Sequence, residues 1–158
     1  MTRTTPESEK WQEVKKAIET KVGQDRITLG PYVSHWIRCT PRRLLFALSY
    51  YKFAAKLIGE NKTVLEIGCS EGLGTVLLAE FSKKVVGVDV DGAAVAEAQK
   101  TFGSEKMEFV NQDMMECDLG RFDAVASFDV IEHIFPDNED LFFKAVVGHL
   151  TDDGLCIM

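Results

Sequence analysis

Residues 64–75 read VLEIGCSEGLGT, an apolar run followed by a glycine-rich turn and a second apolar segment. Val64, Leu65 and Ile67 suit a short strand buried on both faces, as in a parallel sheet covered by helices. Glycine lacks a side chain, so the turn can adopt positive φ and let a ligand approach the backbone. The segment from Thr75 onward (TVLLAEF) is expected to be a helix, whose N-terminus would face such a ligand.

A second strand, KVVGVD from Lys84 to Asp89, ends on a carboxylate. Asp89 follows Gly68 by 21 residues, close to the spacing of about 20 at which a carboxylate meets the hydroxyl groups of a bound ribose. Two vicinal hydroxyls can donate to one carboxylate. The strand, the glycine turn, the helix and the acidic strand end together predict a pocket for a nucleotide-sized ligand.

In this order the motifs resemble those of the class I, Rossmann-like methyltransferases that depend on S-adenosylmethionine (SAM). The resemblance covers about residues 64–158 and implies an α/β fold, a doubly wound and mostly parallel sheet, with SAM as the cofactor. Residues 61–158 would form the SAM-binding domain, and residues 1–60 an N-terminal helical cap or lid. The chain has Ser70 where the family usually has the middle glycine, and serine is small enough to be tolerated there.

The resemblance also implies which residues hold the cofactor. Glu66 and the glycines of the turn match the motif that lies along the methionine part of SAM, and Asp89 with Val90 matches the motif for the ribose and the adenine edge. Asp113, in the segment NQDMM, resembles the residue that meets the adenine amino group. The predicted cofactor contacts are Glu66, Gly68, Cys69, Ser70, Gly72, Gly74, Asp89, Val90, Asp113, Met114 and Asp129.

The segment FDAVASFDVIEHI, from Phe122 to Ile134, resembles the strand and loop that lie near the reacting methyl group in the family's small-molecule members. On this resemblance Asp129, Glu132 and His133 are the candidate catalytic residues. Histidine changes its charge near neutral pH and can therefore accept a proton from a hydroxyl or amine nucleophile. The implied reaction is direct displacement, which gives S-adenosylhomocysteine and a methylated small molecule, and alignment of the reactants supplies most of the catalysis.

Three other hypotheses share parts of this pattern. Residues 68–72, GCSEG, also fit the GxSxG turn of α/β hydrolases, with Asp129 and His133 in the required chain order. That class leaves Asp89 unexplained and expects strands ahead of the turn, where residues 1–61 look helical. A nicotinamide-binding domain shares the acidic strand end, but the glycines do not fit G-x-G-x-x-G. A SAM-binding module without turnover is the third hypothesis.

The composition of the chain argues against nucleic-acid, metal and membrane partners. The 158 residues suit one domain, and the net charge of −7 argues against a nucleic-acid partner, which usually requires a basic face. Arg38, Arg42 and Arg43 form the basic cluster of this acidic chain. Four cysteines without CxxC spacing fit reduced thiols in the cytoplasm and predict no metal site. The apolar stretch 44–58 is shorter than the ~20 residues that span a bilayer, so no membrane partner is expected.

Helix signals frame the remaining segments, because Thr5-Pro6 and Thr40-Pro41 each read as a cap followed by the first helical residue. Asp91 is expected to cap the helix that follows the second strand. The expected elements are helices at 6–22, 42–58, 93–100 and 137–150, an irregular segment at 24–39, strands at 107–110 and 122–128, and a turn at 151–154 before a fifth strand.

The chain stops after this fifth strand, whereas the resemblance implies two further strands. An uncovered apolar strand edge recruits other strands. We therefore expect either a product truncated after the fifth strand, in which much of the acceptor-binding region is missing, or a homo-oligomer or partner chain that covers the edge. The identity of the small-molecule acceptor does not follow from these residues.

Overall fold

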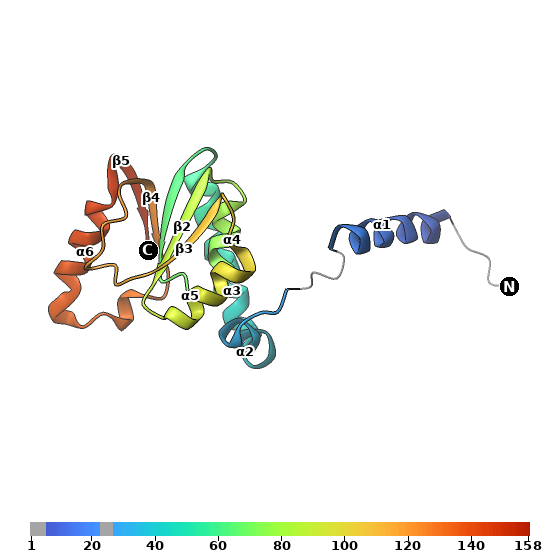
Figure 1. The fold of residues 1–158 in the computed structure, drawn as a ribbon, viewed down its shortest axis with the longest axis horizontal. Coiled ribbons are helices and arrows are strands. Elements are labelled where there is room, and N and C mark those ends of the chain that lie inside the picture. The colour runs from blue at the N-terminus through green and yellow to red at the C-terminus, as the bar shows by residue number, and fades with distance from the viewer. Residues whose placement is uncertain (1–5, 23–26) are drawn as a thin grey trace.

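The computed structural model describes residues 6–22 and 27–158, in which five parallel strands form one sheet in the order β3-β2-β1-β4-β5 (Figure 1). The strands are β1 (Thr63–Ile67), β2 (Lys84–Asp89), β3 (Met107–Asn111), β4 (Phe122–Ser127) and β5 (Leu150–Ile157). The helices are α1 (Pro6–Val22), α2 (Pro31–Cys39), α3 (Pro41–Ile58), α4 (Leu73–Ala79), α5 (Gly92–Phe102) and α6 (Glu139–Gly148), with 3-10 turns at Ile131–His133 and Pro136–Asn138.

Helices cover both faces of the sheet (Figure 1). On one face Ala54 of α3 and Leu78 of α4 pack with Val64 of β1, and α5 packs there against β3. On the other face Phe142 of α6 packs with β1 and β4, and residues 114–119 extend this second layer. The predicted fold, a doubly wound and mostly parallel α/β sheet with an N-terminal helical extension, is confirmed, and all five strands described here are parallel.

The central strand β1 carries one acidic residue into this core. Side chains alternate along a strand, so Val64 and Glu66 face α3 and α4 while Leu65 and Ile67 face α6. All four side chains are buried. The apolar run that predicts a strand buried on both faces is therefore correct, and Glu66 is the exception that requires polar partners.

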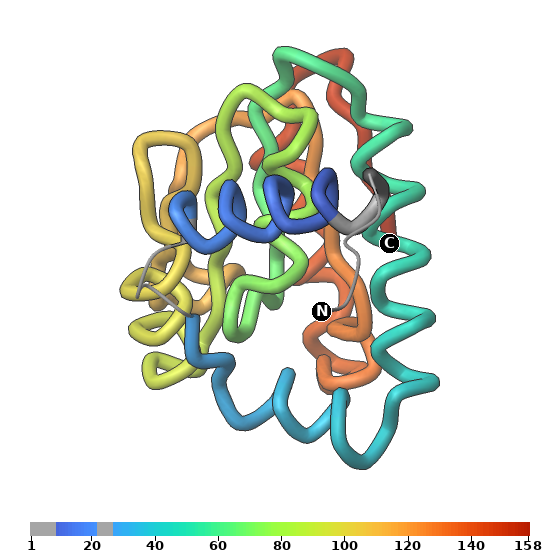
Figure 2. The backbone as a smooth tube through the Cα atoms, turned by 90° about the vertical axis from the view of Figure 1, so that its right-hand side faces the viewer, coloured from blue at the N-terminus to red at the C-terminus, as the bar shows by residue number. Residues whose placement is uncertain are grey.

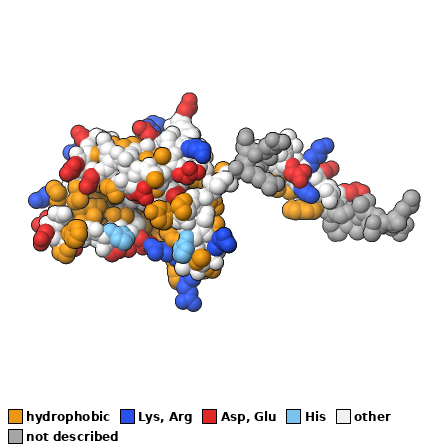
Figure 3. Space-filling model, turned by 60° about the horizontal axis from the view of Figure 1, so that its bottom comes forward, with side chains coloured by type: hydrophobic (Ala, Val, Ile, Leu, Met, Phe, Trp, Pro, Cys, Tyr) orange, Lys and Arg blue, Asp and Glu red, His pale blue; other side chains and the backbone are white. Residues whose placement is uncertain are grey.

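The N-terminal helices differ in how they relate to the sheet. The helix α1 stands apart from the rest of the described chain in Figure 1, and Figure 2, turned by 90°, views the molecule with α1 in front of the rest of the described chain. Its side chains Trp11, Val14 and Ile18 are exposed, as the apolar patch on this helix in Figure 3 illustrates. By contrast, α3 supplies buried residues to the core beside the sheet. The predicted cap Thr5 lies outside the described residues.

Two predicted segments are wrong, and most other elements lie close to their predicted bounds. Residues 31–39, predicted to be irregular, form α2. Pro31 occupies the start of this helix, and Glu71 accepts hydrogen bonds from its first free backbone N–H groups. Residues 151–154, predicted as a turn, belong to β5, where a register shift against β4 accommodates the extra residues.

Candidate functional site

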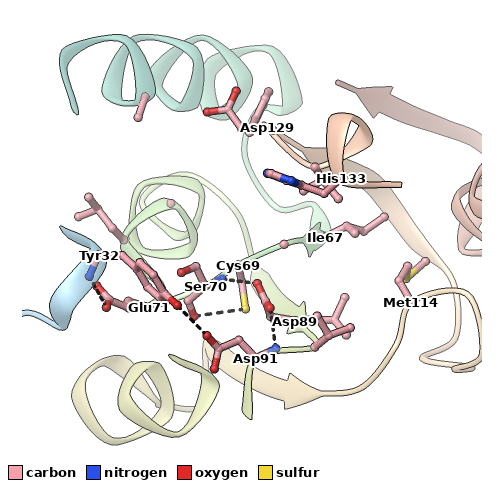
Figure 4. Close-up of a pocket in the computed structure, with 18 of the residues that line it drawn as sticks. Tyr32, Ile67, Cys69, Ser70, Glu71, Asp89, Asp91, Met114, Asp129 and His133 are labelled. Atoms are coloured by element: carbon pink, nitrogen blue, oxygen red, sulfur yellow. Dashed lines mark hydrogen bonds between the residues drawn. The ribbon is translucent and has the colours of Figure 1, made fainter. Parts of the chain in front are cut away.

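A cavity of about 660 Å³ opens at the carboxyl ends of β1, β2 and β4 and is covered by α2 and α3 (Figure 4). In open α/β sheets this position, where the strand order reverses, is the usual ligand site. The predicted cofactor residues that line the cavity are Gly68, Cys69, Ser70, Gly74, Asp89, Val90, Asp113, Met114 and Asp129. Glu66 and Gly72, from the same prediction, are not among the lining residues.

Two glycines of the turn allow close packing around the cavity. Gly68 has a φ of 78°, and a Cβ atom on it would overlap the side chain of Val130. A Cβ atom on Gly74 would overlap the ring of Tyr51, which α3 brings onto the start of α4. The absence of side chains at these positions therefore lets the strand ends, α3 and α4 meet at one point.

The other two positions of the motif have different roles. Gly72 has a φ of 81° and faces away from the cavity, where a Cβ atom would lie 2.8 Å from the ring of Phe109. Ser70, the departure from the family motif, also adopts a left-handed conformation, with a φ of 46°. Its small side chain fits, but an L-residue carries a conformational cost in this region that glycine avoids.

The carboxylate of Asp89 organises the turn. Its Oδ2 accepts a hydrogen bond from the backbone N–H of Ser70 at 2.8 Å, and its Oδ1 accepts one from the N–H of Asp91 at 2.9 Å. Each carboxylate oxygen can accept more than one hydrogen bond, so Asp89 retains capacity for hydroxyl donors in the cavity. In the described part of the chain no hydrogen bond joins Ser70 to His133, the contact a serine hydrolase uses to activate its nucleophile.

Glu66 lies beneath the cavity, not on its surface. Its side chain is fully buried, and its two oxygens accept hydrogen bonds from the hydroxyl groups of Tyr51, at 2.6 Å, and Thr75. Burial raises the pKa of Glu66 to about 7, although the two hydroxyl donors favour the ionised form. Glu66 thus connects α3 and α4 to β1, and Tyr51 is the member of this group that lines the cavity.

The end of the cavity that lies away from Asp89 combines charged and aromatic groups (Figure 4). Asp129, whose φ is 54°, accepts a hydrogen bond from the hydroxyl of Tyr50 at 2.8 Å and lies 3.7 Å from a guanidinium nitrogen of Arg43. Burial and this hydrogen bond raise the pKa of Tyr50. The guanidinium of Arg43 lies 5.3 Å from the ring centre of Trp36, a cation–π distance. His133 lines the same end of the cavity.

Glu132 is the predicted catalytic residue that does not join this group. It is exposed and lies outside the lining of the cavity, because the 3-10 turn Ile131–His133 directs adjacent side chains in different directions. The structure therefore does not bring Glu132 together with the other two predicted catalytic residues. Asp129 and His133 do come together at the cavity, as Figure 4 shows.

The helix α2 closes one side of the cavity through a contact that the sequence does not reveal. Glu71 is buried, and its carboxylate accepts hydrogen bonds from the backbone N–H groups of Tyr32, at 2.8 Å, and Val33, at 2.9 Å. The hydroxyl of Tyr32 donates to Asp91 at 3.2 Å. Neither Glu71 nor the lining residue Tyr50 is predicted, since a turn residue and an aromatic residue in an apolar helix carry no local functional signal.

No group of His, Cys, Asp and Glu side chains within 6–22 and 27–158 has the arrangement of a metal site. Over the same residues, no helix combines the length and hydropathy needed to cross a bilayer.

Comparison with known proteins agrees with this geometry. A family model described as a methyltransferase domain matches residues 64–154. A protein of Mycobacterium tuberculosis, named as a probable SAM-dependent methyltransferase, is 36% identical over 144 residues, which cover 90% of this chain and 48% of that protein. The chain spans a third to a half of the length of the first curated relatives it matches.

Solved structures match the fold. The complex of DhpI with S-adenosylhomocysteine (SAH) has a TM-score of 0.63 at 22% identity, covering 78% of this chain and 60% of that chain. The sugar N-methyltransferase KedS8 from a Streptoalloteichus species also has a TM-score of 0.63, at 21% identity, covering 84% of this chain and 54% of that chain. At these identities the likeness establishes a shared architecture.

Proposed function

Since the chain belongs to the methyltransferase-domain family, we propose that it binds SAM and forms the cofactor-binding part of an enzyme that methylates a small-molecule acceptor. The observation that carries this proposal is the cavity at the ends of β1, β2 and β4. Its volume of about 660 Å³ lies within the ~300–1,000 Å³ of small-molecule sites.

The proposed contacts follow the lining of the cavity. Asp89 accepts hydrogen bonds from the ribose hydroxyls, Val90 and Met114 contact the adenine ring, and Asp113 accepts from its amino group. The glycine turn lies along the methionine part. Four carboxylates besides Asp89 border the same region, and their negative potential favours a sulfonium cation. These supporting residues are Glu71, Asp91, Asp113 and Asp129, all of which line the cavity.

The acceptor is proposed to enter at the end formed by Asp129, His133 and Tyr50. When bound, SAM supplies a methyl group that is already activated for transfer. The chain's own contribution is to orient the acceptor beside that group, to exclude water with the aromatic side chains, and to receive the acceptor's proton on a ring nitrogen of His133. Glu132 has no contact in this proposal, because it lies outside the cavity.

A binding module that holds SAM without turnover is the second candidate. The chain spans 48% of the length of its relative from Mycobacterium tuberculosis. A homo-oligomer or partner chain that covers the edge of β5 also belongs to the proposal. A cytoplasmic location is proposed because all four cysteines are free.

Calorimetric titration with SAM, SAH and NAD tests the cofactor. We expect micromolar affinity for SAM and SAH and no binding of NAD. Asp89→Asn should weaken SAM binding at least tenfold, because a neutral amide accepts fewer and weaker hydrogen bonds than a carboxylate. The matched control is Asp153→Asn, an exposed position on β5. Asp89 also holds the turn, so Val90→Arg provides a second cavity variant at an exposed residue.

NAD binding in place of SAM binding would contradict the proposal. Unchanged SAM affinity in both Asp89→Asn and Val90→Arg, with circular dichroism showing both variants folded, would also contradict the assigned cavity. Release of SAH in the presence of an acceptor would distinguish the enzyme from the binding module.

A further inference from the structure

Positive charge is concentrated on two adjacent helices. Residues 27–59 include no Asp or Glu, although the chain as a whole has a net charge of −7. This segment forms α2 and α3, which pack against each other and cover the cavity. Its cations are Arg38, Arg42, Arg43, Lys52 and Lys56. Figure 3 shows Lys and Arg side chains beside apolar side chains on the lower, protruding part of the molecule.

The side of α3 that faces away from the sheet is apolar as well as cationic. Phe46, Phe53 and Leu57 are 59%, 62% and 51% exposed, and their spacing of seven and four residues places them in one stripe. Arg42, Lys52 and Lys56 lie along the flank of this stripe and are also exposed. We call these six residues the outer face of α3.

Exposed aromatic and leucine side chains flanked by Lys and Arg are the pattern of a helix that lies on a membrane surface. The apolar side chains enter the boundary between headgroups and acyl chains, and the cations extend to the phosphate groups. We propose that the outer face of α3 binds the surface of an anionic lipid bilayer. This proposal departs from the expectation that a membrane is not a partner. That expectation rested on the length of the apolar stretch 44–58, which is too short for a spanning helix but does not bear on a surface contact.

The charges on this face favour lipid over other partners. Two copies of the chain that met through the outer face would bring the same cations together, which opposes such a dimer. A nucleic acid would pair with the cations but would leave Phe46, Phe53 and Leu57 without apolar partners. An anionic bilayer satisfies both the charge and the apolar surface, because it presents phosphate groups above acyl chains.

Flotation with lipid vesicles tests the proposal. The wild-type protein should bind vesicles of phosphatidylcholine mixed with phosphatidylglycerol, and should bind pure phosphatidylcholine much less. Binding should fall at high salt, because the screening length shortens to about 3 Å at ~1 M. The triple variant R42Q/K52Q/K56Q should lower the partition coefficient about 100-fold, at about fivefold per cation. The double variant Phe46→Ser with Phe53→Ser leaves the charge unchanged and should also lower the partition coefficient relative to the wild type.

The matched control is K100Q/K106Q/K144Q, which removes the same charge from exposed positions outside α2 and α3. Because all these positions are exposed, circular dichroism should show folded variants. SAM binding should be unchanged, since none of them lines the cavity. Vesicle binding and SAM binding are separate measurements, so either proposal can fail alone.

Three results would overturn the inference. The first is the absence of binding to anionic vesicles. The second is an equal loss of binding in the control triple variant, which would indicate a nonspecific charge effect. The third is a dimer in light scattering that Phe46→Ser with Phe53→Ser dissociates, since the outer face would then be occupied by a second copy of the chain.

Discussion

Replacement of Glu66 by glutamine is expected to stabilise the protein above neutral pH and to remove a pH dependence. Burial raises the pKa of Glu66 to about 7 in the folded chain, from an ordinary value of 4.5. Below about pH 4.5 the carboxyl is protonated in both states. As the pH rises from there to about 7 the unfolded chain releases the proton first, so the free energy of unfolding falls by about 3 kcal/mol.

Glutamine reproduces the protonated carboxyl in shape and charge. Its amide oxygen can accept from the hydroxyl of Tyr51, and its NH2 group can donate to the oxygen of Thr75. Glu66→Gln should therefore keep both contacts and show no loss of stability between about pH 4.5 and 7. Carboxyls with lowered pKa, such as Asp91 and Asp123, act in the opposite sense, and their contribution is lost only as the pH falls into the acid range.

Urea denaturation followed by circular dichroism near pH 5 and near pH 8 provides the measurement. Glu66→Gln should exceed the wild type by about 3 kcal/mol near pH 8 and by only about 1 kcal/mol or less near pH 5. Glu116→Gln, at an exposed position, is the matched control and should follow the wild type at both pH values. The reasoning would be refuted by a Glu66→Gln variant that is less stable than the wild type near pH 8. It would also be refuted if the variant's free energy of unfolding fell with pH as steeply as that of the wild type.

Three further substitutions test the turn and its neighbours. Ser70→Gly should raise the free energy of unfolding by about 0.5 kcal/mol, because glycine relieves the left-handed strain but costs more chain entropy; a loss of stability would contradict the strain at this position. Gly72→Ala and Gly120→Ala share a positive φ, but a Cβ atom meets an aromatic ring 2.8 Å away only at Gly72. Urea titration should therefore show Gly72→Ala to be about 2 kcal/mol more destabilising, and equal effects would argue against the close contact. Glu71→Ala removes the acceptor at the start of α2, worth about 1–2 kcal/mol. Trypsin should then cleave after Arg38 about tenfold faster, and an unchanged rate would show that α2 does not depend on this carboxylate.

Local pattern was sufficient for the strands β1 to β4 of the sheet. The strands β1 and β2 are apolar runs that end at a glycine or an acidic residue, and their bounds are set by neighbouring residues. The helix α5 follows Asp91, whose side chain caps it as expected. Such elements depend on contacts within a few residues of each other, which a single sequence displays.

Elements that depend on distant residues were not predictable in this way. The helix α2 begins at Pro31, but the acceptor for its N–H groups is Glu71, 39 residues beyond Tyr32 in the chain. The orientation of Glu66 follows from the alternation of β1 together with the hydroxyl of Tyr51 on another element. At the site, the segment 122–134 singled out Asp129 and His133, and both line the cavity. The sequence could not show that Glu132, beside them in the chain, points away.

The carboxylate of Glu71 belongs at once to the glycine turn and to the start of α2. A ligand bound against that turn therefore contacts the same residue, Glu71, on which the order of α2 depends. Thermodynamic linkage makes the coupling between ligand binding and the ordering of α2 reciprocal. A bound ligand protects the amide protons of α2 from hydrogen exchange by a certain factor. At an unchanged association rate, an ordered α2 lowers the dissociation rate of that ligand by the same factor. The hydrogen-exchange rate of those amide protons thus reports how much of the protein has a ligand in the cavity.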